Sequence, residues 1–229
     1  MSNILNCQFY CLSFNNEERK NNMLQRFKKL EIDCKFHSGI PHNDKRIWDT
    51  LNAKCKRQWS MTYGHLDLIH DFYYNSDKKY AIICEDDIEL HVNFKTILNK
   101  VLCDFFIMKL DILLLGYLLP YKIGYENLLT NFKLKKPIPK EAHFKYHEYP
   151  NYLNGTHMYV ITKSYAKHLL NNYYYNYAGI YDQYFTPDDI LIKDGNKALI
   201  YPMLAIENNK QDDLYHQLCR NINCTELYS

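Results

Sequence analysis

The chain alternates short apolar segments with segments of helical periodicity, and this alternation limits the folds that it can adopt. Apolar runs typical of strands occur at Gln8–Leu12, Asp33–His37, Tyr80–Cys84, Asp111–Leu119 and His157–Ile161. Apolar side chains recur at helical spacing within Met23–Leu30, Leu66–Tyr73, Phe94–Leu102 and Ser164–Tyr173. Strands separated by helices of this length predict βαβ units, so we expect an α/β fold.

The run Tyr80–Cys84 indicates how the sheet is covered. Its residues are apolar without alternation, which is the pattern of a strand buried on both faces. We therefore expect a Rossmann-like, mostly parallel central sheet with helices on both faces. A chain of 229 residues fits one compact domain spanning 1–229. Within it we expect an irregular polar stretch at 38–56 and a long basic loop or excursion, containing Tyr and His, at 120–150.

Composition argues against several classes of partner. Lys and Arg number 28 against 26 Asp and Glu, and this net charge of +2 argues against a general nucleic-acid binder. The most apolar stretch, Asp111–Leu119, has about half of the roughly 20 residues that a membrane span needs. The first residues show no signal-peptide pattern, and the 8 cysteines form no Cys-x-x-Cys pair. We therefore expect reduced thiols and a cytoplasmic location.

Three consecutive acids, Glu85-Asp86-Asp87, follow the apolar run Tyr80–Cys84 directly. In an open α/β sheet, ligands bind at the carboxyl ends of the strands. Adjacent carboxylates repel one another, and they are hard ligands suited to Mg²⁺ or Mn²⁺. The acids therefore predict a cation site that can bridge to a diphosphate, with a solvated acidic turn as the alternative.

The run Tyr80–Leu90, an apolar strand followed by Glu-Asp-Asp and another apolar residue, resembles the hallmark of glycosyltransferase family 25, the lipooligosaccharide and collagen galactosyltransferase group. Further segments resemble the family's motifs in the family's order. They are Phe9–Arg19 with Met23–Leu30, then Ser60–His65, then Gly155–Ala166 with Leu169, Leu170 and the downstream Asp182. The resemblance covers about residues 7 to 205.

Some positions depart from the family pattern. Ser60-Met61 stands in place of the family's Gly-Cys, and Gly64 in place of Ser, so that of this segment His65 remains. Cys11-Leu12-Ser13 replaces the usual Asn-Leu of the opening motif. These differences concern details of the donor site, and they leave room for a changed sugar or a lost activity.

The resemblance implies a GT-A-like fold, a nucleotide-sugar donor, most often UDP-linked, and transfer with inversion at the anomeric carbon. Asp87 and Asp86 would hold Mn²⁺ or Mg²⁺ next to the leaving diphosphate, where negative charge develops. Inversion requires a general base for the acceptor hydroxyl. Asp182 matches the family's downstream acid and is the candidate, with Asp188 and Asp189 as alternatives.

Further residues complete the expected site. The donor is expected to meet Ser13, Arg19, His65, Glu85 and Asp86. Arg19 would reach a phosphate or a sugar hydroxyl, and the alternative is a solvated helix arginine. His157 is a candidate third metal ligand, and the alternative for both His157 and His65 is a structural histidine.

Three surface segments add candidates for binding the acceptor or the diphosphate. The excursion at 120–150 is basic, and a solvated loop is its alternative; its basic residues include Lys133, Lys135, Lys136, Lys140, His143, Lys145 and His147. Tyr173–Tyr175 and Tyr177 could stack on an acceptor sugar or pack in the core. Asp212, Asp213 and His216 could close over the site or belong to a loose tail.

Together these features predict a metal-dependent inverting hexosyltransferase that moves galactose or glucose from a UDP-sugar to a glycan or another hydroxyl acceptor. One alternative is a degenerate relative that binds a nucleotide sugar or glycan without turnover. A second is a metal-dependent phosphoryl- or nucleotidyl-transfer enzyme, although the chain has no Gly-x-x-x-x-Gly-Lys loop.

Overall fold

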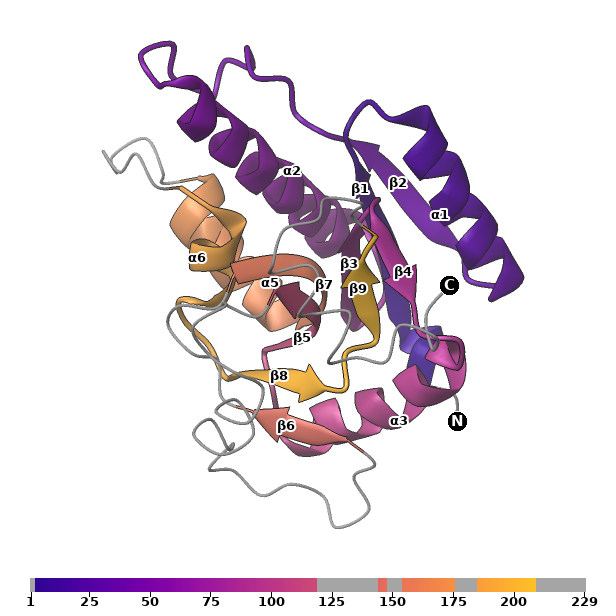
Figure 1. Cartoon of the computed structure of the whole chain (residues 1–229). Helices are drawn as coiled ribbons and strands as arrows, with labels where there is room; N and C mark the ends of the chain where they lie inside the picture. The colour runs from indigo at the N-terminus through magenta and orange to yellow at the C-terminus, as the bar shows by residue number, and fades with distance from the viewer. Residues whose placement is uncertain (1–2, 119–143, 148–153, 176–184, 209–229) are drawn as a thin grey trace.

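The computed structural model describes residues 3–118, 144–147, 154–175 and 185–208 (Figure 1). Within these residues a seven-stranded sheet has the order β2-β1-β3-β7-β5-β8-β6. The strands are β1 (Cys7–Ser13), β2 (Cys34–Ser38), β3 (Tyr80–Glu85), β5 (Ile112–Leu118), β6 (Lys145–His147), β7 (Asn154–Thr162) and β8 (Lys197–Tyr201). The expected strands near residues 8, 33, 80, 111 and 157 are thus all present.

The sheet is mostly parallel, as predicted. β2, β1, β3, β5 and β8 run in one direction, whereas β7 and β6 run in the other. β7 is inserted between β3 and β5 and pairs antiparallel with both. The carboxyl ends of β1 and β3 therefore meet at one edge of the sheet, next to the amino end of β7.

Helices cover both faces of the sheet. Successive side chains of each strand point to opposite faces, so each strand contributes to the core on either side. Tyr10 and Leu12 of β1 face the core formed with α2 (Ala53–Asn75), α5 (Lys163–Leu169), η2 (Leu170–Tyr174) and α6 (Pro187–Ile192). Phe9 and Cys11 face the core formed with α1 (Glu17–Lys29) and α3 (Phe94–Ile107). The short η1 (Asn3–Asn6) precedes β1. The predicted α/β class is confirmed.

A two-stranded ribbon follows the acidic run. β4 (Ile88–Leu90) pairs antiparallel with β9 (Ala205–Glu207), which Figure 1 draws beside it in yellow. β9 packs closely on β5, since a Cβ at Gly116 would lie 2.6 Å from the backbone oxygen of Ala205. The sequence analysis predicted neither strand, nor β8 nor α6.

Helix α2 begins earlier than expected. The irregular stretch predicted at 38–56 gives way to helix at Ala53, where the side chain of Asn52 accepts a hydrogen bond from the Cys55 backbone N–H at 2.9 Å. The helix ends at Asn75. Its middle turns contain the segment Ser60–His65, so this segment is helical.

The basic excursion predicted at 120–150 falls largely outside the described residues, and so do Lys133, Lys135, Lys136, Lys140 and His143. Lys145–His147 forms strand β6 and pairs with β8, so this part of the expected loop belongs to the sheet. Cys11, Cys34, Cys55 and Cys84 are free thiols. None of the described helices has the length and apolar character needed to cross a membrane.

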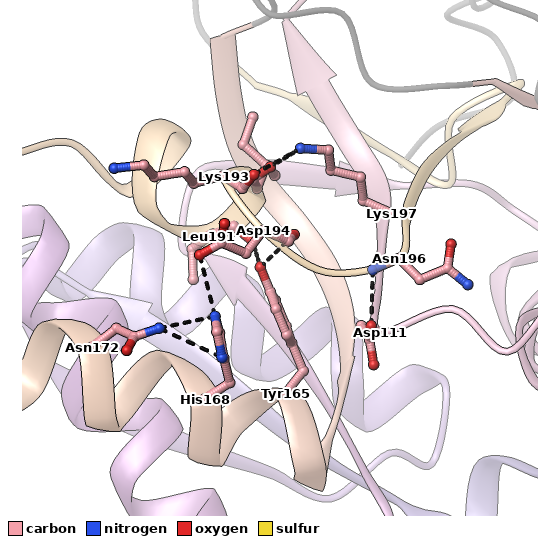
Figure 2. Close-up of polar contacts among 10 residues, drawn as sticks. Asp111, Tyr165, His168, Asn172, Leu191, Lys193, Asp194, Asn196 and Lys197 are labelled. Atoms are coloured by element: carbon pink, nitrogen blue, oxygen red, sulfur yellow. Dashed lines mark hydrogen bonds and ion pairs between the residues drawn. The ribbon is translucent and has the colours of Figure 1, made fainter.

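Polar contacts fix the end of α6 (Figure 2). The hydroxyl of Tyr165 on α5 donates to the backbone oxygens of Leu191 and Asp194, each at 2.9 Å. Lys197 donates to the backbone oxygens of Ile192 and Lys193 at the last turn of the helix. These contacts attach α6 to α5 and β8, and so determine where the amino end of α6 lies.

Candidate active site

The acids Glu85, Asp86 and Asp87 lie where β1 and β3 end side by side. Glu85 is the last residue of β3 and stands opposite Leu12 of β1 in the parallel register. Ser13, the last residue of β1, donates from Oγ to Oδ2 of Asp86 at 2.7 Å. The pairing of the two strands thus brings together residues separated by more than 70 positions in the sequence.

Arg19 reaches the same acids from the first turn of α1. Asn16 caps this helix by accepting a hydrogen bond from the Arg19 backbone N–H at 3.0 Å. The Nη1 atom of Arg19 lies 2.9 Å from Oδ2 of Asp87 and 3.8 Å from Oδ1 of Asp86. Arg19 is therefore part of the acidic site rather than a solvated helix residue, although its side chain is 44 % exposed.

Two histidines flank Glu85. Nε2 of His65 lies 3.4 Å and Nδ1 of His157 lies 3.9 Å from the Glu85 carboxylate. The other ring nitrogen of His65 is 2.9 Å from the hydroxyl of Tyr159 on β7. Burial alone would raise the pKa of Glu85, but the hydrogen bond from His65 and the charge of His157 lower it overall. Glu85 is thus held as an anion by its surroundings.

The pKa of Asp87 is shifted in the opposite direction, upward. Burial and the negative charges of Glu85 and Glu207 raise its pKa to about 7, against the lowering effect of His157 and Arg19. Its Oδ1 atom is buried and has no hydrogen-bond partner among the described residues. An unpartnered carboxylate oxygen within a cluster of negative charge is an environment that a cation would stabilise.

Glu207 enters the site from the end of β9. The Asn208 backbone N–H, next along the chain, donates to the Asp87 backbone oxygen at 2.5 Å. Nε2 of His157 lies 3.6 Å from Oε2 of Glu207. His157 is buried, and neither of its ring nitrogens has a hydrogen-bond partner within the described part of the chain. No local sequence pattern marked Glu207, because β9 is short and far along the chain.

Among residues 3–118, 144–147, 154–175 and 185–208, no group of three or more His, Cys, Asp or Glu side chains is already arranged around one point. The carboxylates are nevertheless suitable donors, since carboxylate oxygens bind Mn²⁺ and Mg²⁺. The free Oδ1 of Asp87 and the surrounding negative charge fit a divalent ion.

Asp182 and the segment Tyr177–Tyr184 lie outside the described residues, so the first candidate for the general base is not placed. Of the two alternatives, Asp188 points toward the site from the amino end of α6. It is hydrogen-bonded to the backbone of Gly155 and the side chain of Thr156, and burial and the charge of Glu85 raise its pKa. Asp189 is exposed and bonded to the helix cap Thr186.

A cavity of about 390 Å³ opens beside the acids. It is lined by Leu12, Phe14, Arg19, Gly39, His42, Arg57, Ser60, Met61, Glu85, Asp86 and Asp87. Phe14, His42 and Arg57 were not predicted: Phe14 follows β1, His42 lies in the loop after β2, and Arg57 lies on α2. Tyr173 packs in the core, as its alternative interpretation held, and Asp212, Asp213 and His216 lie outside the described residues.

The fold is an α/β fold of the GT-A-like class, with an acidic cavity at the carboxyl edge of its parallel strands. The sequence model of glycosyltransferase family 25, described as an LPS biosynthesis protein, matches residues 6–192. The chain therefore belongs to glycosyltransferase family 25 and is a glycosyltransferase. The resemblance drawn from the motifs is confirmed.

Three solved structures align with the chain at low sequence identity. A197 from STIV aligns with a TM-score of 0.44 and 10 % identity, covering 84 % of this chain and 81 % of its own. A glycosyltransferase involved in the glycosylation of the major capsid of PBCV-1 aligns with a TM-score of 0.45 and 8 % identity. The alignment covers 93 % of this chain and 99 % of that one. The inositol-1-phosphate CTP transferase from T. maritima aligns with a TM-score of 0.39 and 12 % identity. The alignment covers 95 % of this chain and 77 % of that one. No curated protein sequence matches the chain significantly.

Proposed function

We propose that this glycosyltransferase is metal-dependent and inverting, and that it moves galactose or glucose from a UDP-sugar to a glycan or another hydroxyl acceptor. One observation carries the proposal. Asp87 lies at the carboxyl edge of the sheet beside a cavity, with one oxygen on Arg19 and the other buried without a partner. Such a carboxylate is suited to a divalent ion, and the family membership supports a sugar donor.

The residues around the acids support a diphosphate at this edge. When bound at Asp87 and Asp86, with His157 as a further candidate ligand, Mn²⁺ or Mg²⁺ would supply positive charge next to the leaving diphosphate. Arg19 carries five N–H donors, and Nη1 alone makes its two contacts to carboxylates. Donors therefore remain for phosphate oxygens, where charge develops as the sugar leaves.

Ser13, His65 and Glu85 have positioning roles in this proposal. Ser13 fixes the side chain of Asp86 through its hydroxyl. Fully buried His65 is held by Tyr159 and in turn contacts Glu85, so the floor of the site is rigid. These contacts hold Glu85 and Asp86 in place, so that repulsion between the carboxylates does not move them apart.

The general base is the remaining role. A carboxylate with a raised pKa is the stronger base, and this favours Asp188, which faces Glu85 and His157 from α6. Asp182 keeps the role that the family resemblance implies for it. Separate Asn variants at the two positions distinguish them, because the variant at the base retains donor binding and loses transfer.

The test is a transfer assay with a panel of UDP-hexoses in Mn²⁺, in Mg²⁺ and in EDTA. The proposal predicts transfer that EDTA abolishes, a product of inverted anomeric configuration by NMR, and no transfer by Asp87→Asn. Asp77→Asn is the matched control, because the Asp77 side chain is 89 % exposed just after α2. Unchanged turnover and metal response in Asp87→Asn would contradict the proposal. Binding of every donor without turnover would favour the degenerate relative.

A cytoplasmic location is part of the same proposal. It is supported by the free thiols of Cys11, Cys34, Cys55 and Cys84, since free thiols persist in reducing compartments.

A further inference from the structure

The cavity has an aromatic wall as well as an acidic one. Phe14, the residue after β1, is 42 % exposed although it is a large apolar side chain. Its ring is stacked against the imidazole of His42, with ring centroids 5.9 Å apart and an interplanar angle of 29°. Both side chains line the cavity that the acids also line. An exposed aromatic ring at a cavity wall offers a flat face to a ligand.

The position of the Phe14 ring depends on Gly39. A Cβ at Gly39 would lie 2.0 Å from Cδ2 of Phe14, which is too close for two non-bonded carbon atoms. The Gly39 backbone N–H donates to the Ser13 backbone oxygen at 2.9 Å, so the two backbone segments cannot move apart freely. The ring therefore rests against bare backbone on one side and His42 on another, which fixes its orientation.

The charges around this ring narrow the class of ligand. Arg57 is exposed on α2 and lines the same cavity, as does Arg19. Phe14 is joined directly to Ser13, whose hydroxyl holds Asp86. An aromatic face, two guanidinium groups and a cation-suited acid thus surround one cavity of about 390 Å³. A nucleotide combines the complementary groups, a flat base and a phosphate chain.

We propose that Phe14, supported by Gly39 and His42, is the stacking platform for the nucleobase of the donor, and that Arg57 binds its phosphates. The inference rests on the proposed function, which it deepens by assigning the nucleoside half of the donor. The acceptor sugar is the other ligand that stacks on aromatic rings, and the experiment separates the two.

Binding of UMP and of ribose 5-phosphate, which lacks the base, is measured by calorimetry in EDTA. Phe14→Ala should weaken UMP binding by about 5- to 150-fold, the range found for loss of one base–aromatic stack. The same variant should leave ribose 5-phosphate binding unchanged, and Phe14→Trp should restore UMP affinity. Gly39→Ala should behave as Phe14→Ala does. Phe106→Ala, at a 69 % exposed phenylalanine on α3, is the matched control.

Unchanged UMP affinity in Phe14→Ala would overturn the inference, and would leave the proposed function standing if the wild type transfers hexose. Equal loss of UMP and ribose 5-phosphate binding would also overturn it, because Phe14 would then only maintain the cavity. A wild type that lacks transfer but binds UMP through Phe14 would contradict the proposed function and support the platform. Arg57→Ala should weaken the binding of both UMP and ribose 5-phosphate. Weaker binding of UMP alone would contradict the proposal that Arg57 binds the phosphates.

Discussion

Replacing Asp87 by Asn should stabilise the ion-free protein at neutral and alkaline pH. In the unfolded chain this carboxyl ionises near its ordinary pKa of 3.8, whereas burial and the charges of Glu85 and Glu207 raise its pKa to about 7 in the fold. Between these values the folded protein keeps a proton that the unfolded chain has lost. The free energy of unfolding therefore falls as pH rises from about 4 to 7, and then levels off. Asn cannot ionise, so the variant lacks this fall.

The size of this stabilisation follows from the difference of about 3 between the pKa values of Asp87 in the folded and unfolded chain. At 1.36 kcal/mol for each pH unit, ionisation of Asp87 costs the fold about 4 kcal/mol above pH 7. The side chain is only 16 % exposed, so water screens the charge little. The variant also loses the contact to Arg19, worth about 1 kcal/mol at most because Arg19 is 44 % exposed. The net gain of about 3 kcal/mol corresponds to a Tm higher by about 6–12 °C.

The assay is thermal melting in EDTA from pH 4.5 to 8.5. Asp71→Asn is the control of opposite sign. Burial would raise the pKa of Asp71, but hydrogen bonds from Asn75, Tyr10 and Lys35 lower it overall. Asp71→Asn should therefore lower Tm throughout this pH range, because the lowered pKa of Asp71 lies below pH 4.5 and its carboxylate stays ionised in the fold. A Tm of Asp87→Asn equal to or below that of the wild type at pH 8 would refute the reasoning.

Three further substitutions test other parts of the structure. Gly116→Ala should cost about 1–3 kcal/mol, because its Cβ would press on the backbone oxygen of Ala205, and thermal melting measures the loss. Tyr146→Phe should cost about 1–3 kcal/mol in urea unfolding, because it removes the hydroxyl that donates to buried Asp104 at 2.6 Å. Asp188→Asn should lower the transfer rate by about 100- to 10,000-fold with unchanged UDP affinity. Normal transfer by that variant would assign the base to another acid.

The sheet was largely predictable, since Tyr80–Cys84 becomes β3, a central strand with helices on both faces. The reversed direction of β7 was not, because an apolar run looks the same in either orientation. The first turns of α2 were missed because lysines and arginines obscure the apolar spacing. Cys55, Trp59, Thr62 and Leu66 are buried at helical spacing behind the Asn52 cap, and this was the signal available.

The acidic core of the site was predictable from three adjacent carboxylates after an apolar strand. The partners of those acids were predictable only in part. Arg19 meets Asp87 because β1 and β3 are neighbours, whereas the family resemblance predicted only that Arg19 lies at the donor site. Glu207 reaches the site through the pairing of β9 with β4, and Phe14 is oriented by Gly39. Such contacts join distant segments and leave no periodic pattern in the sequence.

The most direct test of the divalent, nucleotide-dependent donor site is thermal melting with Mn²⁺ alone, UDP alone, and both together. A ligand at about 100 times its Kd adds roughly 2.7 kcal/mol, which corresponds to a Tm shift of about 5–10 °C for a chain of this size. We predict that the shift with both ligands exceeds the sum of the separate shifts, and that Asp87→Asn abolishes this excess. Additive shifts in the wild type, or an undiminished excess in Asp87→Asn, would contradict a donor site built on Asp87.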